Sequence, residues 1–405
     1  MSKPFSSFFL GIGAKRLSQV DIDSSISNQH EIGSNSFTQI LGSEKVRFSG
    51  KFIYMPDNED GVIENQGQLT WYDTRENQPH RSAEWRLYYT SQDVIPSAKV
   101  NDLVIIARTA ADQLLLIVSP MGSTSEHQLL WLFGLEEVGK KFIIRDFSGE
   151  RRELGFAAKY IVSSLGIETE ETADDYLEEL LRRYGKTFPT TKVFSEFSRS
   201  TVKHVSPVEA PDETLLAWME REELLFKTLE RVIVEERLQK GFGTENNNVE
   251  EFINFSLSVH NRRKSRAGFS LEHNLCVLFS ANEIRYSHGA VTERNSKPDF
   301  IFPGITHYKN SEFDVSLLTM LGVKTTAKDR WRQVLAEASR IQKKHLITLE
   351  PGISSNQTEE MKANYLQLVI PAQILPSFSY EQRSGILTLK DFIDVVKDRQ
   401  ERVPL

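Results

Sequence analysis

The sequence predicts two domains, a β-rich first half followed by an α/β second half. Its 405 residues suffice for two or three domains. In the first ~165 residues, short segments rich in β-branched and aromatic residues predict a barrel or sandwich, namely 51–54, 67–72, 84–89, 103–107, 114–118 and 141–145. The second half alternates helical and strand patterns, which is typical of an α/β domain.

Composition places the chain among soluble globular proteins. Apolar residues make up 39% and charged residues 26%, which excludes collagen-like, coiled-coil and disordered chains. Cys276 is the single cysteine, so an internal disulfide and a cysteine-built zinc site are both excluded, as in a reducing cytoplasm. No apolar run reaches the roughly 18 residues of a membrane span, and the first 16 residues do not read as a signal peptide. We therefore expect a cytoplasmic protein with no membrane partner.

Charge is patterned strongly along the chain. The net charge of −7 argues weakly against nucleic acid. However, residues 262–266 hold four bases, and residues 324–344 hold seven bases against two acids. Because the local field decides whether phosphate is attracted, the second half can still bind nucleic acid.

An acidic segment marks the predicted domain junction. Residues 168–179 hold seven acids and no Lys or Arg, and their apolar residues have helical spacing. Arg182, Arg183 and Gly185 then give a helix-stop signal. We expect a first domain over residues 1–167, an acidic helical linker over 168–186 and a second domain over 187–405.

The second half contains several recognisable elements. Patterns predict helices over 212–240, 249–260, 270 to about 282, and 329–344. Strands are expected at 298–302, 317–326, 345–349 and 366–370. A strand, a helix and a second strand in succession imply a right-handed crossover and a parallel pair.

Asp299, Lys324 and Glu337 are candidate catalytic residues. Asp299 precedes a short strand, Lys324 lies in an apolar strand, and Glu337 lies at the edge of the apolar face of the next predicted helix. Two carboxylates that hold Mg²⁺, with a lysine beside them, suit phosphodiester hydrolysis. From the spacing alone, Lys324 could equally be a strand-end lysine whose ammonium reaches solvent.

The sequence around these residues resembles the EcoRII restriction endonuclease family, a branch of the PD-(D/E)xK nucleases. The resemblance runs from about residue 188 to beyond 371, on segments 261–268, 270–272, 297–300 and 323–333. In the wider superfamily an acid stands two residues before the lysine, where this chain has Gly322. The resemblance implies that the acid comes instead from Glu337, and that Glu272 (an outer metal or water ligand) and Tyr308 join the site. Helix-dipole complementarity for Glu272 and a partly buried loop aromatic for Tyr308 remain open as alternatives.

Predicted DNA contacts fall on two segments of the second half. Lys328, Asp329, Arg330 and Arg332 open the helix that follows Lys324; an N-cap with solvated bases is the alternative. Arginine reads guanine and aspartate accepts from cytosine. The resemblance implies that this segment reads CC:GG pairs in a CC(N)GG-type site such as CCWGG. Phosphate contacts are expected from Arg262, Arg263, Lys264 and Arg266.

The first half resembles, more weakly, the amino-terminal effector domain of the same family, a DNA-binding pseudobarrel. The resemblance rests on residues 15–18, His30 with Gly33, and residues 81–86. It implies effector-DNA contacts by His30, Arg81, Glu84 and Arg86, against the alternative of an exposed charged hairpin. It departs after Gly33, at Ser34-Asn35, and in the spacing before Arg86, so the site could read another or a modified sequence.

Together these features predict an Mg²⁺-dependent type II restriction endonuclease, of type IIE, that binds double-stranded DNA as a homodimer. Its amino-terminal domain would bind a second copy of the site and control autoinhibition, and a cognate DNA methyltransferase would be encoded nearby. Two alternatives stay open, a modification-dependent nuclease and a non-catalytic DNA-binding regulator.

Overall fold

The chain forms two compact units in a computed structural model. The structure describes residues 3–22, 30–78, 80–90, 93–169, 173–243 and 248–403. Unit 1 comprises residues 1–169 together with 351–357, and unit 2 comprises residues 170–350 and 358–405. The boundary at Thr169 falls inside the predicted linker, of which residues 170–172 lie outside the described residues.

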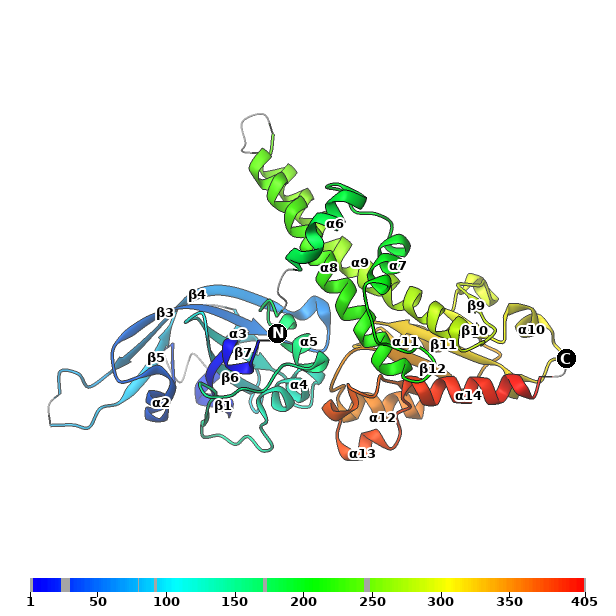
Figure 1. Cartoon of the computed structure of the whole chain (residues 1–405). Coiled ribbons are helices and arrows are strands. Elements are labelled where there is room, and N and C mark those ends of the chain that lie inside the picture. The colour runs from blue at the N-terminus through cyan, green and yellow to red at the C-terminus, as the bar shows by residue number, and fades with distance from the viewer. Residues whose placement is uncertain are drawn as a thin grey trace. The chain divides into compact units, whose positions relative to one another are not determined.

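Unit 1 is built on one eight-stranded sheet (Figure 1). The strand order is β2-β5-β4-β3-β7-β6-β1-β8, all neighbours being antiparallel except β3 and β7. The strands are β1 (Phe9–Arg16), β2 (Glu31–Ile32), β3 (Val46–Tyr54), β4 (Ile63–Asp73), β5 (Trp85–Tyr89), β6 (Leu103–Thr109), β7 (Leu114–Ser119) and β8 (Ile143–Asp146). Each of the six predicted β segments lies in one of these strands, wholly or in part, so the prediction of a β-rich first half is confirmed. Among the described residues no pairing joins β2 to β8, and the pseudobarrel stays a prediction.

Both faces of the central strands of unit 1 are buried. Alternate residues of β6 and β7 enter two separate apolar clusters, Ile105 and Ile117 in one, Ile106 and Leu116 in the other. A strand buried on both faces loses its polar alternation, which explains the continuous apolar runs of these segments. Helices α4 (Thr124–Phe133) and α5 (Phe156–Ser164) pack in the first cluster, so the unit is not purely β.

Unit 2 begins with a group of helices. They are α6 (Asp174–Tyr184), α7 (Thr191–Ser200), α8 (Pro211–Lys240) and α9 (Val249–Ala281), with α8 and α9 side by side (Figure 1). Pro211 stands in the first turn of α8 and Gly241 follows its end, as the sequence predicted. Leu180 of α6 is fully buried against α7 and α8. The helical part of the predicted linker is therefore part of the core of unit 2.

A five-stranded mixed sheet forms the rest of unit 2, in the order β13-β12-β11-β10-β9. Its strands are β9 (Ser287–His288), β10 (Phe300–Phe302), β11 (Thr319–Lys324), β12 (Lys344–Thr348) and β13 (Leu366–Val369). The pairs β11/β12 and β12/β13 are parallel, which confirms the predicted parallel pair. The other helices are α10 (Ile305–Lys309), α11 (Trp331–Leu335), α12 (Ser355–Ala363), α13 (Tyr380–Arg383) and α14 (Leu389–Glu401).

Two helix predictions in this unit are wrong. The helices expected at 249–260 and from 270 are one continuous α9, because Arg266 between them is buried and pairs with Glu223 of α8. Of the helix expected over 329–344, only α11 (Trp331–Leu335) forms. Ala338 has a φ of 46°, a left-handed conformation that ends any α-helix.

Within the described residues, no helix is both long enough and apolar enough to span a bilayer.

Candidate active site

Asp299 and Lys324 meet where two paired strands end. Because β10 and β11 are antiparallel, with Phe300 opposite Leu321, the residue before β10 lies beside the last residues of β11. Asp299 Oδ2 accepts hydrogen bonds from the Val323 N–H at 2.6 Å and from Lys324 Nζ at 3.4 Å. Both side chains are largely shielded, with 18% and 14% of their surfaces exposed. Burial raises the pKa of Asp299 even though Lys324 and the Val323 N–H oppose the rise.

Glu337 completes this group from the turn that follows α11. Its Oε2 is buried and makes no hydrogen bond within the described part of the chain. Burial, and then the negative charge of Asp299, raise the pKa of Glu337 to about 7, while Lys324 and Lys344 act in the opposite direction. The structure therefore brings the three predicted catalytic residues within electrostatic reach of one another.

Position 322 has no room for a side chain, and so none for an acid. A Cβ at Gly322 would lie 2.8 Å from Cγ2 of Val334, a buried residue of α11. That distance is shorter than van der Waals contact, so α11 occupies the space that a side chain at position 322 would need. The close packing fixes α11, and with it the start of the Glu337 turn, against β11.

A mainly carboxylate donor set of this kind fits Mg²⁺. Mg²⁺ is bound through oxygen, commonly by one or two carboxylates with several waters retained. Asp299 and Glu337 offer two carboxylates with raised pKa values, and Glu337 Oε2 is buried without a hydrogen-bond partner in the part of the chain that the structure describes. A bound cation would give that oxygen a partner and would favour the ionised form of both carboxylates. No group of three or more His, Cys, Asp or Glu that could hold a metal occurs among the described residues.

Known proteins resemble the part of the chain that carries this candidate site. Residues 226–393 match the family model described as EcoRII C terminal. Over these residues the chain is similar to that family. It is 45% identical over 184 residues to the type II restriction enzyme EcoRII of Escherichia coli, and the alignment covers 45% of each protein. The type II restriction enzyme SsoII of Shigella sonnei is 26% identical over 149 residues, covering 34% of this chain and 47% of the relative. The chain thus spans a little under half the length of the curated relatives it matches.

Solved structures of restriction enzymes are more distant. Metal-depleted Ecl18kI in complex with uncleaved, modified DNA is 18% identical at a TM-score of 0.46, covering 58% of this chain and 88% of that chain. The complex of restriction endonuclease PspGI with substrate DNA is 16% identical at a TM-score of 0.41, covering 58% and 95%.

Glu272 lies beside the candidate site. It projects from α9, and its Oε2 lies 2.9 Å from Nε2 of His288 on β9. This hydrogen bond raises the pKa of His288, and the Glu272 charge contributes to the raised pKa of Asp299. Sequence reasoning missed His288, which no motif marks. It also missed Lys344, a buried lysine whose pKa burial lowers and whose Nζ donates to the Ile341 carbonyl at 2.9 Å.

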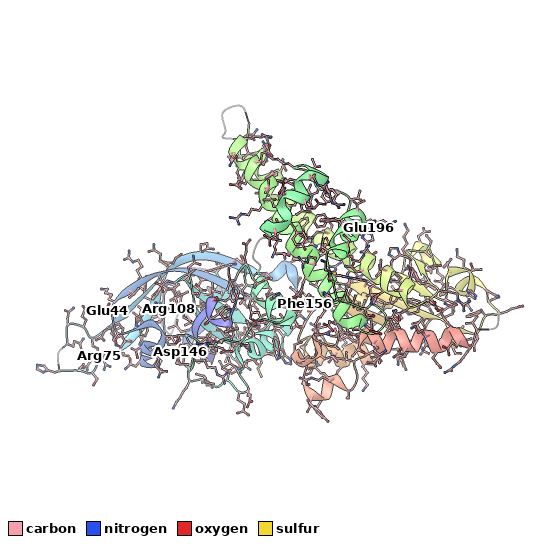
Figure 2. The ribbon with its side chains drawn as sticks, in the orientation of Figure 1. Glu44, Arg75, Arg108, Asp146, Phe156 and Glu196 are labelled. Carbon is pink, nitrogen blue, oxygen red and sulfur yellow. The ribbon has the colours of Figure 1, made fainter. Side chains whose placement is uncertain are left out.

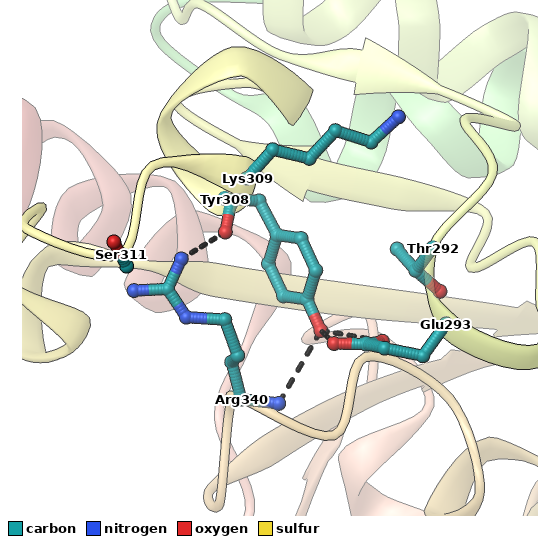
Figure 3. A pocket seen from close by; sticks show the side chains of 6 residues that line it. All are labelled: Thr292, Glu293, Tyr308, Lys309, Ser311 and Arg340. Atoms are coloured by element: carbon teal, nitrogen blue, oxygen red, sulfur yellow. Dashed lines mark hydrogen bonds between the residues drawn. The ribbon is translucent and has the colours of Figure 1, made fainter.

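Tyr308 lies in a different setting from the one predicted (Figure 3). It is 2% exposed on α10, and its hydroxyl donates to Glu293, with distances of 2.5 and 2.8 Å to the two carboxylate oxygens. Burial, and then the hydrogen bond to Glu293, raise the pKa of Tyr308 to about 12. No hydrogen bond recorded for the described residues joins Tyr308 to Asp299, Lys324 or Glu337. Its hydroxyl stays protonated at neutral pH, which does not suit a general base.

The predicted DNA-reading segment is a turn rather than the body of a helix. The N–H groups of Ala327 and Lys328 donate to Glu350 Oε2 at 2.6 and 3.0 Å, and Trp331 is fully buried. These contacts fix the backbone and leave Asp329, Arg330 and Arg332 exposed. Arg332 is engaged by Glu360 at 2.8 Å and stacks on the Trp331 ring.

The four basic residues predicted to contact DNA phosphate differ in burial and in their ion pairs. Arg266 is 4% exposed and pairs with Glu223, so our prediction that it contacts DNA phosphate is wrong. A buried arginine needs a carboxylate partner, and α8 supplies it. Arg263 pairs with Glu230 at 2.5 Å but keeps 46% of its side chain exposed. Arg262 lies over the Phe188 ring, and Lys264 is exposed.

In unit 1 the two predicted effector loops lie on neighbouring strands. His30 directly precedes β2, which pairs with β5, the strand that holds Arg86. The His30 ring therefore lies near that of Tyr89, also on β5, with ring centroids 5.6 Å apart. Asn35, where the resemblance departs, donates to the Ala83 carbonyl at 3.0 Å and accepts from the Trp85 N–H at 2.8 Å. Asn35 thus joins the two loops through these hydrogen bonds.

Glu84 organises the charges of the second effector loop. Its carboxylate pairs with Arg86 at 2.6 Å and with Arg75 at 2.5 Å, and the hydrogen bond from Arg86 holds the pKa of Glu84 below its usual value. Arg81 is exposed and donates to Gln78 at 3.4 Å. Arg75, labelled in Figure 2, follows β4 and was missed because it lies outside the matched segment.

Proposed function

We propose that the chain is an Mg²⁺-dependent, site-specific DNA endonuclease whose active site is Asp299, Lys324 and Glu337. The observation that carries the proposal is the Asp299–Lys324 pair at the strand ends, with Glu337 close by, whose buried Oε2 has no hydrogen-bond partner among the described residues. The match to the EcoRII C-terminal family supports the reaction class.

Each residue has a separate role. Asp299 and Glu337 would hold the metal, which when bound polarises the scissile phosphate and lowers the pKa of water. Lys324 is held toward Asp299 by its ion pair and places a positive charge where the phosphorane would gain negative charge. The Val323 N–H fixes the Asp299 carboxylate so that it needs no reorientation. Glu272 adds negative charge at the edge of the site.

DNA recognition is proposed for residues 328–332, the turn that leads into α11 together with the start of that helix, where Asp329, Arg330 and Arg332 are exposed. Arg330 and Asp329 would read guanine and cytosine in a CC(N)GG-type site such as CCWGG, with Lys328 and Arg332 beside them. Arg262, Arg263 and Lys264 would contact phosphates. Since a palindrome has two-fold symmetry, the enzyme would cut both strands as a homodimer.

For unit 1 we propose binding of an effector DNA copy through His30, Arg81, Glu84 and Arg86, and control of autoinhibition. A cognate methyltransferase would protect the host site. The joining of both effector loops through Asn35 supports a single binding surface. A second candidate, a modification-dependent nuclease, is favoured by the same residue, because Asn35 stands where the resemblance departs.

Digestion of methylated and unmethylated plasmids with Mg²⁺, followed by sequencing of the cut ends, tests the function. Cutting at defined sites in unmethylated DNA supports classical restriction, and cutting of methylated DNA alone supports modification dependence. Asp299→Ala and Lys324→Ala should each abolish cleavage while leaving specific binding within about tenfold, since both act on the metal and the transition state. Substantial cutting by either variant refutes the active-site assignment. DNA binding without cleavage by the wild-type chain supports the non-catalytic regulator.

A further inference from the structure

Glu337 is not carried by a helix. α11 ends at Leu335, and Ala338, the residue after Glu337, has a φ of 46°. A left-handed alanine is sterically disfavoured and persists only where the surroundings impose it. The direction of the Glu337 side chain therefore depends on what holds the turn at both of its ends.

The start of the turn is held by packing. Val334 lies against the bare backbone of Gly322, and Trp331 and Val334 are both fully buried. This anchor lies three residues before Glu337.

The other end is held by hydrogen bonds from Arg340, three residues after Glu337. Its N–H donates to the Tyr308 hydroxyl at 3.3 Å. Its guanidinium donates to the carbonyl oxygens of Tyr308, of Asn310 at 2.9 Å and of Phe313 at 3.3 Å. A planar guanidinium has five N–H donors in a rigid arrangement, so one side chain can join the turn to three carbonyls.

Tyr308 extends this connection to Glu293 (Figure 3). A phenol has one proton to donate, and that proton lies between the two oxygens of the Glu293 carboxylate. The same oxygen accepts from Arg340, so both functions of the hydroxyl are already used. Burial raises the pKa of Glu293, but hydrogen bonds from Tyr308 and Ser339 outweigh it and hold that pKa below its usual value.

We propose that Glu293, Tyr308 and Arg340 form a clamp that positions Glu337 for metal-dependent cleavage. The inference rests on the proposed function and deepens it: Tyr308 is a positioning residue rather than a catalytic one, and Glu293 and Arg340 join it. The clamp borders a cavity of about 300 Å³ lined by Thr292, Glu293, Tyr308, Lys309, Ser311 and Arg340. Because open space lies on that side, the Arg340 end of the turn depends on these hydrogen bonds in addition to the packing of the buried Ala338 and Ile341.

Loss of the clamp should weaken the metal site more than it weakens DNA binding. Tyr308→Phe keeps the buried ring and removes the hydroxyl that links Glu293 to Arg340. Groups that orient metal ligands typically contribute 10–100-fold in metal affinity or activity. We expect single-turnover cleavage to fall about 10–100-fold and half-saturation to need more Mg²⁺. DNA affinity, measured in Ca²⁺, should stay within about threefold.

Variants of Glu293 separate positioning from chemistry. Glu293→Gln keeps an acceptor for the phenol and should retain most activity, whereas Glu293→Ala should reproduce Tyr308→Phe. Residues that act as one unit are non-additive, so the double variant should be little worse than either single variant. Additive losses would show that Tyr308 acts independently of Glu293, and would overturn the clamp. Ser311→Ala, in the same cavity lining, is the matched control and should behave as the wild type.

A readout independent of cleavage is the rise in melting temperature on adding Mg²⁺ to the full chain. The clamp predicts a smaller rise in Tyr308→Phe and Glu293→Ala than in wild type and Ser311→Ala, because a misplaced Glu337 binds the metal less well. An unchanged rise together with unchanged cleavage, or a loss in DNA affinity alone, overturns the proposal. If the wild-type chain does not cut DNA, the proposed function fails, and this thermal comparison still decides whether the clamp exists.

Discussion

Replacing Glu337 by glutamine should stabilise the metal-free protein at neutral and alkaline pH while abolishing cleavage. In the folded chain the pKa of Glu337 is raised to about 7, first by burial and then by Asp299, against an ordinary value of 4.5. Glutamine keeps the shape of the side chain without a charge. The destabilising species is the ionised carboxylate, whose buried Oε2 accepts no hydrogen bond from any described residue, and the substitution removes it.

The magnitude follows from linkage between folding and protonation. Because the pKa of Glu337 is higher in the folded chain than in the unfolded chain, Glu337 contributes fully to stability below pH 4.5. This contribution is lost as the pH rises through about 7. The shift of roughly 2.5 pKa units corresponds to about 3 kcal/mol at most. Since the side chain is only part-buried, we expect an observed difference on the order of 1–3 kcal/mol at pH 8 and close to zero at pH 4.

Calorimetric melting of both proteins in EDTA at pH 4, 6 and 8 measures this difference. A gain of 1 kcal/mol raises the melting temperature by roughly 2–4 °C for a unit of this size. Glu312→Gln changes an exposed carboxylate and is the control, with no pH-dependent gain expected. In saturating Mg²⁺ the wild type should be more stable than Glu337→Gln, because the Glu337 carboxylate would then bind the cation. A glutamine variant that is less stable at pH 8, or equally shifted at pH 4 and 8, would refute the reasoning.

Three more predictions concern packing, recognition and domain limits. Gly322→Ala should destabilise the fold by about 1–3 kcal/mol and slow cleavage, as measured by urea unfolding and single-turnover rates, because its Cβ would meet α11 at 2.8 Å. In competition binding assays, Arg330→Ala should lower the discrimination at one base pair by about 1–3 kcal/mol of binding free energy. Arg263→Ala should instead weaken binding to all DNA sequences alike and make binding less dependent on salt. The reverse pattern would mean that Arg263 reads bases and Arg330 contacts phosphate. A fragment starting at residue 173 should melt at a higher temperature than one starting at 187, since the shorter fragment lacks the buried Leu180. Autoinhibition predicts that the longer fragment cuts a one-site plasmid faster than the full chain, and equal rates would argue against it.

Strand positions were predictable where burial leaves a periodic or continuous apolar pattern. The runs at Leu103–Ala107 and Leu114–Val118 lie between two apolar clusters, and such strands are visible in a single sequence. Strand β1 (Phe9–Arg16) was missed. Its glycines, Gly11 and Gly13, interrupt the apolar pattern, yet each lies where a Cβ would collide with Ile40 or Phe37. Close approach from a distant segment cannot be read from local sequence.

Helix limits failed where tertiary contacts decided them. The polar run Asn261–Arg266 resembles a loop in sequence, yet it continues α9 because Arg266 reaches Glu223 across the helix pair. The opposite error occurred after Leu335, where good helix formers such as Ala338 do not form a helix. In both places a side-chain contact between segments far apart in the chain outweighs local propensity.

The second of these errors bears directly on the candidate site. Identifying Glu337 needed only the resemblance, because the residue type and its distance from Lys324 along the chain are sequence properties. Its surroundings needed the fold. A carboxylate at the edge of a regular helix would have its direction fixed by the helix itself, whereas one on a turn takes its direction from the anchors at Val334 and Arg340. With the proposed acid at position 337 instead of 322, Gly322 is free to accept α11, and the proposed metal site would depend on Tyr308 and Glu293, residues that would otherwise have no connection with the chemistry.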